Sequence, residues 1–417
     1  MGRFWTFRYT LLNAAYFIAF CTIHAMAAVY LLANGFNNTE VGILLAVANI
    51  LSAVAQPVFA GIIDKPGALT NRRFIIISVL IILAGSVILM VSDENKPVIF
   101  IFYTIIYMVQ FAYQPVMTAL CFEYEKAGCN IYYGLARGLG SASFAITAFF
   151  VGGIVENMGV KILLIINIVA MVISAVIAYT FKLPATADRK NRISGDHPDD
   201  DRLLEKTAYV TSEPESISQE KAHNNFFDFI KTYPAYAWFL VATICFFFAH
   251  NMINDFMIQI IRALGGGETE LGYANFLQAI LELPVMALIG IILKKITSNT
   301  LLIVSGVAFF IKILILIFAA NMVMMYISQS FQMFAYAVFI PAAAYYVSEN
   351  MAELDQVKGQ AFITSAITIG GVFSNLISGW ILDNLGITVM LTVGTVICGI
   401  GVVIAGFSMR KKVTIHG

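Results

Sequence analysis

Charge is scarce in this 417-residue sequence. Only 12% of its residues are Asp, Glu, Lys or Arg, whereas 59% are hydrophobic, and this balance excludes a water-soluble chain. The 25 basic residues equal the 25 acidic ones, so the formal net charge is zero. Because a nucleic-acid-binding protein carries a basic excess, we expect no nucleic-acid partner.

Cysteine is also scarce, and the spacing of the five cysteines matches neither a zinc site nor a disulfide framework. We interpret them as small apolar residues. They are Cys21, Cys121, Cys129, Cys245 and Cys398. The sequence also contains no HExxH and no Gly-x-Ser-x-Gly pattern. We therefore expect no enzyme, no bound metal and no cofactor.

Long apolar segments are abundant. Twelve of them can cross a bilayer as helices, and no ten-residue alternating pattern indicates a membrane barrel. The sequence thus predicts an all-α polytopic membrane protein with twelve transmembrane helices. The segments cover approximately 11–33, 41–63, 74–91, 97–121, 138–155, 160–181, 235–261, 271–293, 300–319, 322–347, 361–382 and 386–407.

One polar stretch divides the segments six and six. Residues 183–230 contain 6 basic and 10 acidic residues, a composition typical of a solvated linker. We predict one six-helix bundle over 1–182, a cytoplasmic linker over 183–230 and a second bundle over 231–417.

Two motifs recur in both predicted bundles at nearly the same offset. The sequence GIIDK at 61–65 corresponds to GIILK at 290–294, and GGIVENMG at 152–159 corresponds to GWILDNLG at 379–386. Such a duplication is typical of transporters that close a central site between two rocking halves.

Basic residues in the short loops indicate the orientation. With the N-terminus inside, the two termini and the short inner loops contain twelve Lys or Arg residues and the outer loops contain three, if the long linker and Arg137 at a helix start are left out. This distribution follows the positive-inside rule. We expect a monomeric, multi-pass protein of the plasma membrane with both termini in the cytoplasm.

A motif around the second apolar segment resembles the loop motif of the major facilitator superfamily. It comprises TEVG at 39–42 and QPVFAGIIDKPG at 56–67, followed by two arginines. The resemblance implies the fold of that superfamily, in which two pseudo-symmetric six-helix bundles enclose the site. It also implies gating roles for Asp64, Lys65, Gly67, Arg72 and Arg73.

Within that superfamily, the sequence is similar to the oligosaccharide:proton symporters, including lactose permease, and to their phenylpropionate-permease-like branch. The resemblance lies in QPVF at 56–59, YGLARGLG at 133–140, Phe144 and Glu282. In that group, an arginine and a glutamate contact sugar hydroxyls and an aromatic ring stacks on the sugar. The resemblance therefore implies these roles for Arg137, Glu282 and Phe144.

The sequence departs from that group in its tenth apolar segment. Gln332 and Ala335 align where the sugar symporters have His and Glu, so the usual proton-binding carboxylate is missing. Lys312 aligns with an arginine of the group.

Polar side chains inside the apolar segments are further candidates, because an ionisable group at the bilayer centre costs about 2.5–3.5 kcal/mol on insertion scales. Gln278 lies one helical turn before Glu282, and Asn251 lies one turn before Asp255. Lys312 lies mid-segment and pairs with a carboxylate, for which Glu282 and Asp255 are the candidates, unless its side chain reaches the membrane surface or loses its charge. Interhelical packing is the alternative explanation for the amides.

These patterns predict the members of a central site. The expected substrate-binding residues are Arg137, Glu282, Phe144, Gln332, Gln278 and Asn251, and the expected proton-coupling residues are Glu282, Asp255 and Lys312.

The sequence thus predicts a secondary active transporter. We expect it to import a small polar organic solute, such as a sugar or glycoside, together with protons by alternating access. Uptake of an aromatic acid or nucleoside, and export of drugs or metabolites by the same fold, remain open alternatives.

Residues 190–222 have the composition of a tether. We expect that replacing them with a Gly/Ser linker of sufficient length leaves transport within about twofold of wild type, since such a segment buries little apolar area. Uptake by membrane vesicles at matched expression measures this. A loss of uptake would instead assign the segment a regulatory role.

Overall fold

The structure, a computed structural model, describes residues 2–63, 69–92, 95–182 and 226–409. All regular elements in these ranges are helices. Eleven helices are long and apolar enough to cross a membrane, and a twelfth crossing results if the bent pair Phe4–Ala25 and Ala27–Ala33 is one span. The predicted fold class, an all-α polytopic membrane protein, is confirmed.

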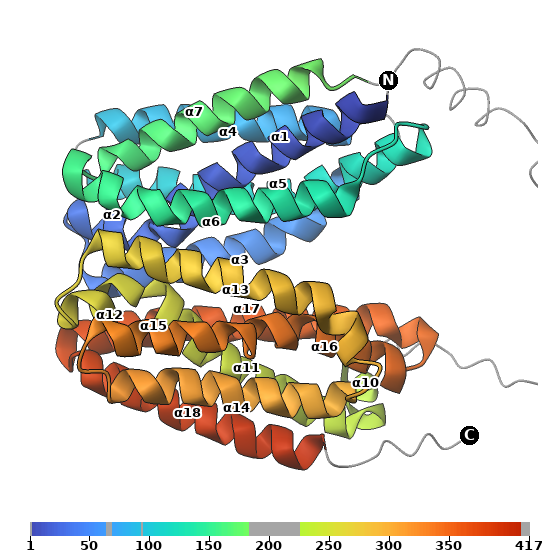
Figure 1. Ribbon diagram of the computed structural model, residues 1–417, viewed down its shortest axis with the longest axis vertical. Helices are drawn as coiled ribbons and strands as arrows, with labels where there is room; N and C mark the ends of the chain where they lie inside the picture. The colour runs from blue at the N-terminus through green and yellow to red at the C-terminus, as the bar shows by residue number, and fades with distance from the viewer. Residues whose placement is uncertain (1, 64–68, 93–94, 183–225, 410–417) are drawn as a thin grey trace, which may run out of the picture.

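The helices form two groups that lie side by side (Figure 1). The N-terminal group comprises α1 (Gly2–Phe20), η1 (Cys21–Ala25), α2 (Ala27–Ala33), α3 (Asn38–Ile63), α4 (Asn71–Val91), α5 (Lys96–Lys126), α6 (Tyr133–Met158) and α7 (Lys161–Thr180). The C-terminal group comprises α10 (Phe226–Thr232), α11 (Pro234–Asp255), α12 (Met257–Ala263), α13 (Glu268–Ile292), α14 (Ser298–Ile317), α15 (Met322–Ser330), η3 (Phe331–Met333), α16 (Tyr336–Asn350), α17 (Glu353–Asn384) and α18 (Ile387–Ser408).

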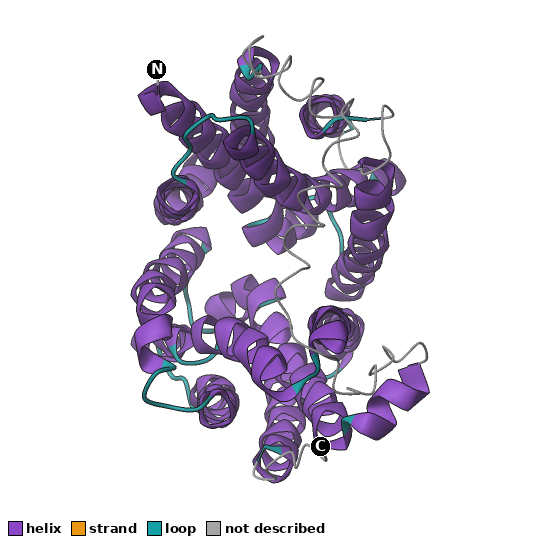
Figure 2. Ribbon diagram, turned by 90° about the vertical axis from the view of Figure 1, so that its right-hand side faces the viewer, coloured by secondary structure: helices purple, strands orange, loops and turns teal. Residues whose placement is uncertain are grey.

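The long helices run between two faces of the molecule. We call the face where α1 begins and α18 ends the terminal face, and the other the opposite face (Figure 1). Figure 2 looks onto the terminal face and shows the two groups one above the other. They meet through two helix pairs, α3 with α17 and α6 with α13.

Two spans that the sequence predicts as continuous helices are broken in equivalent positions. The first bends by 51° after the π-helical turn η1, at Met26, and the seventh breaks at Phe256 between α11 and α12. Met26 and Phe256 lie 230 residues apart (256 − 26) and both have non-helical backbone angles, φ −107° and φ −114°. Apolar composition could not show these breaks, because it is the same on either side of them.

A third break interrupts the segment predicted at 322–347. The 3₁₀ turn η3 separates α15 from α16 and carries Gln332. Short 3₁₀ or π turns within a span often mark a functional position, since they redirect the side chains around them.

The C-terminal end of the predicted linker is helical in the structure. Residues 183–225 lie outside the described residues, but α10 is helical where the sequence predicts linker up to residue 230. The buried Phe229 ring packs against Tyr233, Tyr236 and Phe362, with ring centroids 5.0, 5.9 and 5.1 Å away. This aromatic contact holds α10 against the C-terminal group.

A buried amide ties the helices of the N-terminal group together. Asn167 of α7 donates to Ser86 of α4 at 2.8 Å and accepts from Gln110 of α5 at 3.1 Å. Each such bond between membrane helices contributes about 0.6 kcal/mol on average. The network therefore fixes how α4, α5 and α7 are rotated against one another.

Candidate functional site

The N-terminal group contributes a cation and aromatic rings. The guanidinium carbon of Arg137, on α6, lies 4.3 Å from the centre of the Phe17 ring, and Nη1 donates to Ser141 Oγ at 3.0 Å. A cation over an aromatic face is stabilised by about 0.5–2 kcal/mol. Phe144 lies two turns along α6, with its ring 6.4 Å from that of Phe20. Arg137 and Phe144 therefore lie near the same aromatic cluster.

The C-terminal group contributes a chain of three polar side chains. Lys312 Nζ on α14, which is fully buried, donates to Gln332 Oε1 at 2.8 Å. The amide nitrogen of Gln332 donates in turn to Glu282 Oε1 on α13 at 2.8 Å. A glutamine suits this position because its amide accepts from a cation on one side and donates to a carboxylate on the other.

This hydrogen-bonded series gives the geometry of the lysine–carboxylate pairing that the sequence suggests. Lys312 is linked to Glu282 by hydrogen bonds through the amide of Gln332, and the two charges also attract each other. The η3 turn places Gln332 between α13 and α14. Asp255, the other predicted partner, lies elsewhere, close enough to interact with Asn375 of α17 and with Tyr107 of the N-terminal group.

A second amide pair lies one helical turn from this chain. Gln278 Nε2 donates to the buried Gln329 Oε1 at 2.9 Å, which joins α13 to α15. Gln278 precedes Glu282 on α13, as predicted, and Gln329 precedes Gln332. The C-terminal side of the candidate site thus consists of carboxylate, amide and ammonium groups in consecutive turns.

Tyr336 interacts with residues of both groups of helices. Its hydroxyl interacts electrostatically with Glu282 of its own group and with Arg137 of the other, and its ring stacks on His250 at 5.2 Å. Arg137 and Glu282 are therefore brought near the same residue from opposite groups. Neither spacing nor periodicity relates two such distant positions.

Two predicted residues are engaged away from this arrangement. Asn251 donates to the Phe247 carbonyl of its own helix at 2.8 Å and lies against Gly371 of α17. Arg72 donates through Nε and Nη2 to the carbonyls of Ala178 and Tyr179 at 3.0 and 2.9 Å. Arg72 thus binds the carbonyl end of α7, where a cation is favoured by the helix dipole.

Of the other predicted gating residues, the structure describes Arg73. Asp64, Lys65 and Gly67 lie outside the described residues. The Arg73 backbone N–H donates to the Thr70 hydroxyl at 3.3 Å and so takes part in the N-terminal cap of α4.

An aromatic cluster around His24 was not among the predicted site residues. The His24 ring stacks on Phe20 at 3.9 Å and lies 3.9 and 4.6 Å from Tyr107 and Phe111. The π-helical turn η1 carries His24, and the sequence shows only the histidine itself as a signal. Within the described residues, no group of three His, Cys, Asp or Glu side chains could hold a metal.

Comparisons with known proteins agree with this architecture. A family model, described as the MFS_1 like family, matches residues 9–404. Among curated proteins, none matches the sequence significantly.

Three solved structures with the same fold are examples, and each is a transporter or a homologue of one. A mutant of the nucleoside transporter NupG matches with a TM-score of 0.77 and 15% identity, over 97% of this chain and 100% of that one. A mutant of the peptide transporter POT matches with a TM-score of 0.71 and 10% identity, over 97% and 93%. A bacterial homologue of the human lysosomal transporter Spinster, inward-facing and unoccupied, matches with a TM-score of 0.65 and 11% identity, over 98% and 97%. Identities this low establish the fold alone.

The hydrogen bonds that link Lys312, Gln332 and Glu282 should contribute to the stability of the protein. Gln332→Leu removes the hydrogen-bond acceptor of the buried Lys312 ammonium, and we expect a loss of about 1–3 kcal/mol in the free energy of unfolding. In the double variant Lys312→Met/Gln332→Leu, the buried ammonium is gone, so we expect a melting temperature above that of Gln332→Leu alone. Thermal unfolding of the purified protein in detergent measures both. Additive losses in the double variant would show that Lys312 does not depend on Gln332.

Proposed function

This chain belongs to the MFS_1 like family, within the major facilitator superfamily, and we propose that it imports a nucleoside or a related glycoside together with protons. Its family and its structural relatives are membrane transporters, so the chain is a secondary transporter and not an enzyme. It spans a membrane several times and acts on a small molecule. We place it in the plasma membrane as a monomer, with both termini and the loop motif in the cytoplasm.

The observation that carries the proposal is the contrast between the two sides of the site. The N-terminal side offers Phe17, Phe20, Phe144 and the rings around His24, which suit an apolar or aromatic moiety. The C-terminal side offers the carboxylate, amide and ammonium groups described above, which suit hydroxyls. A nucleoside carries both features, a flat base and a ribose with hydroxyl groups.

Arg137 and Glu282 have the central roles in this proposal. Each comes from one group of helices, and both lie near Tyr336, so a solute between them would touch both halves of the transporter. Gln332 and Gln278 would contact hydroxyls, and Phe144 would contact the apolar moiety. The similarity in fold to the nucleoside transporter NupG supports a nucleoside.

A sugar is the second candidate. It is favoured by the arginine, glutamate and phenylalanine that this sequence shares with the oligosaccharide:proton symporters. A sugar without a base offers a smaller apolar face to the aromatic cluster than a nucleoside does.

Uptake into proteoliposomes tests which solute the protein transports. We expect radiolabelled uridine or adenosine to accumulate, and lactose to accumulate at least about tenfold less, because the apolar side of the site would lose its contact. Arg137→Ala and Glu282→Gln should each abolish uptake at normal insertion into the membrane. Lactose uptake that exceeds nucleoside uptake would favour the sugar proposal.

Proton coupling is tested by separating accumulation from exchange. Ala335 stands where the sugar symporters have a carboxylate, so the proton-binding candidates are Glu282 and Asp255, with Lys312 modulating the first. We expect an inward proton gradient to drive accumulation and Asp255→Asn to leave it intact. If Asp255→Asn abolishes accumulation but preserves solute exchange, Asp255 is the proton site. Wild-type vesicles that equilibrate the solute without concentrating it would exclude proton coupling.

A further inference from the structure

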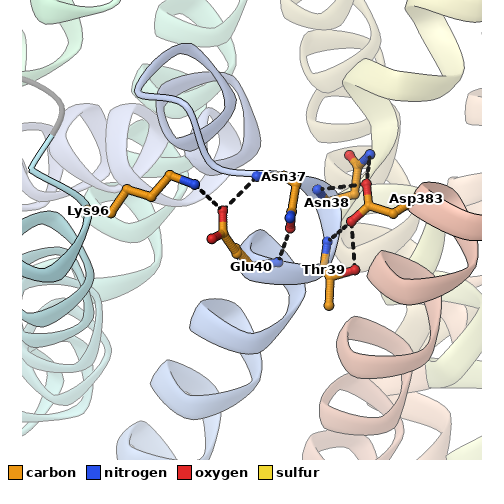
Figure 3. Close-up of polar contacts among 6 residues, drawn as sticks. All are labelled: Asn37, Asn38, Thr39, Glu40, Lys96 and Asp383. Carbon is orange, nitrogen blue, oxygen red and sulfur yellow. Dashed lines mark hydrogen bonds and ion pairs between the residues drawn. The ribbon is translucent and has the colours of Figure 1, made fainter.

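Two acidic side chains join the two groups of helices at the opposite face. Asp383, in the last turn of α17, accepts hydrogen bonds from the backbone N–H of Asn38 at 3.1 Å and of Thr39 at 2.7 Å (Figure 3). The Asn38 amide and the Thr39 hydroxyl donate to the same carboxylate at 2.8 and 2.6 Å. Because α3 begins at Asn38, the carboxylate of the C-terminal group caps a helix of the N-terminal group.

The second contact is equivalent to the first with the groups exchanged. Glu156, in the last turn of α6, accepts from the Thr269 N–H at 3.0 Å and from the Thr269 hydroxyl at 2.6 Å. Thr269 lies in the first turn of α13, a helix of the C-terminal group. Glu156 and Asp383 are 227 residues apart (383 − 156), and each is the fifth residue of the duplicated motif, GGIVENMG and GWILDNLG. The proposed solute site does not use this motif.

Glycines bring the same helices into backbone contact beside both acids. A Cβ atom on Gly42 would collide with the Asn375 carbonyl, and one on Gly379 with the Asn38 backbone. The other helix pair behaves alike, since a Cβ on Gly152 would collide with the Glu268 backbone and one on Gly272 with the Ala148 carbonyl. All four glycines lie toward the opposite face.

The other ends of three of these helices are free of such contact. Among the described residues, an added Cβ would meet no atom within 4 Å at Gly61 of α3, at Gly134 and Gly138 of α6, or at Gly290 of α13. The close contact of the two groups at these helix pairs is therefore concentrated at the opposite face.

We infer that Asp383 and Glu156 are two latches that hold the opposite face of the transporter closed. In alternating access the groups of helices separate at one face while they approach at the other, so both caps must break before the opposite face opens. Each latch holds the carboxylate on backbone N–H groups that otherwise have no partner within their helix. In the orientation proposed above, this face is extracellular and the structure is inward-facing.

The two latches differ in strength. Asp383 accepts four bonds from Asn38 and Thr39, whereas Glu156 accepts two from Thr269 and interacts with the Glu268 backbone N–H. Removal of the Asp383 charge should therefore shift the balance of the two states more than removal of the Glu156 charge.

Distances between spin labels test the latches without any solute, so the result is independent of the solute proposed above. One pair of labels joins Val91 to Leu385 at the opposite face, and a second joins Lys126 to Val357 at the terminal face. All four residues are exposed and lie at or near helix ends, with one of each pair in either group. The labels are attached to introduced cysteines in the full chain, with the five native cysteines replaced, in lipid nanodiscs.

We expect Asp383→Asn to lengthen the opposite-face distance and shorten the terminal-face distance in part of the molecules. The ratio of the two states should change by about tenfold for Asp383→Asn and about threefold for Glu156→Gln, because an asparagine or glutamine replaces an acceptor with a donor facing N–H groups. Opposite changes at the two faces distinguish a shift of state from loss of folding, which would broaden both distributions.

Glu40→Gln is the matched control. Glu40 lies one residue from Thr39, but its carboxylate binds Lys96 Nζ at 2.6 Å within the N-terminal group (Figure 3). This variant removes the same charge at the same face and should leave both distances unchanged. Unchanged distances in Asp383→Asn and Glu156→Gln, or an equal shift in Glu40→Gln, would overturn the inference.

Discussion

A lipid interior offers no hydrogen-bond partners, and the rest of this structure depends on that constraint. It requires the backbone to satisfy itself, which leaves helices as the spanning elements here. It also makes a hydrogen-bond partner valuable to a buried polar side chain. Lys312 is completely buried, and its ammonium is bound by Gln332, whose amide binds Glu282. The polar residues of the proposed site are thus also contacts between helices.

The same constraint limits where the spans can be broken. Irregular backbone at membrane depth is tolerated where protein, and not lipid, surrounds it. The breaks at Met26 and Phe256 adjoin His24 and Asp255, and the third break carries Gln332. Each break therefore lies at or beside a polar side chain. The proposed solute site and the candidate proton sites adjoin these irregular turns.

The duplicated helix pairs connect the proposed site with the motion that transport requires. The two groups of helices meet through equivalent pairs, α3 with α17 and α6 with α13, and each pair combines close glycine contact with an acid that caps the partner helix. Arg137 and Glu282 lie on α6 and α13, one of these same pairs. A separation of the groups at the opposite face therefore also changes the distance between the two residues proposed to hold the solute.

The sequence by itself determined the membrane class, the positions of most spans, the duplication and the list of charged residues inside the spans, because apolar length and local motifs follow the chain. It could not determine the breaks, since helix and turn have the same composition there, nor the start of α10 inside the predicted linker. Only the tertiary structure decided that Gln332 separates Lys312 from Glu282, and that Glu156 and Asp383 cap helices 113 and 344 residues away. These contacts join segments far apart in the chain, and their geometry arises only when the two groups of helices pack together.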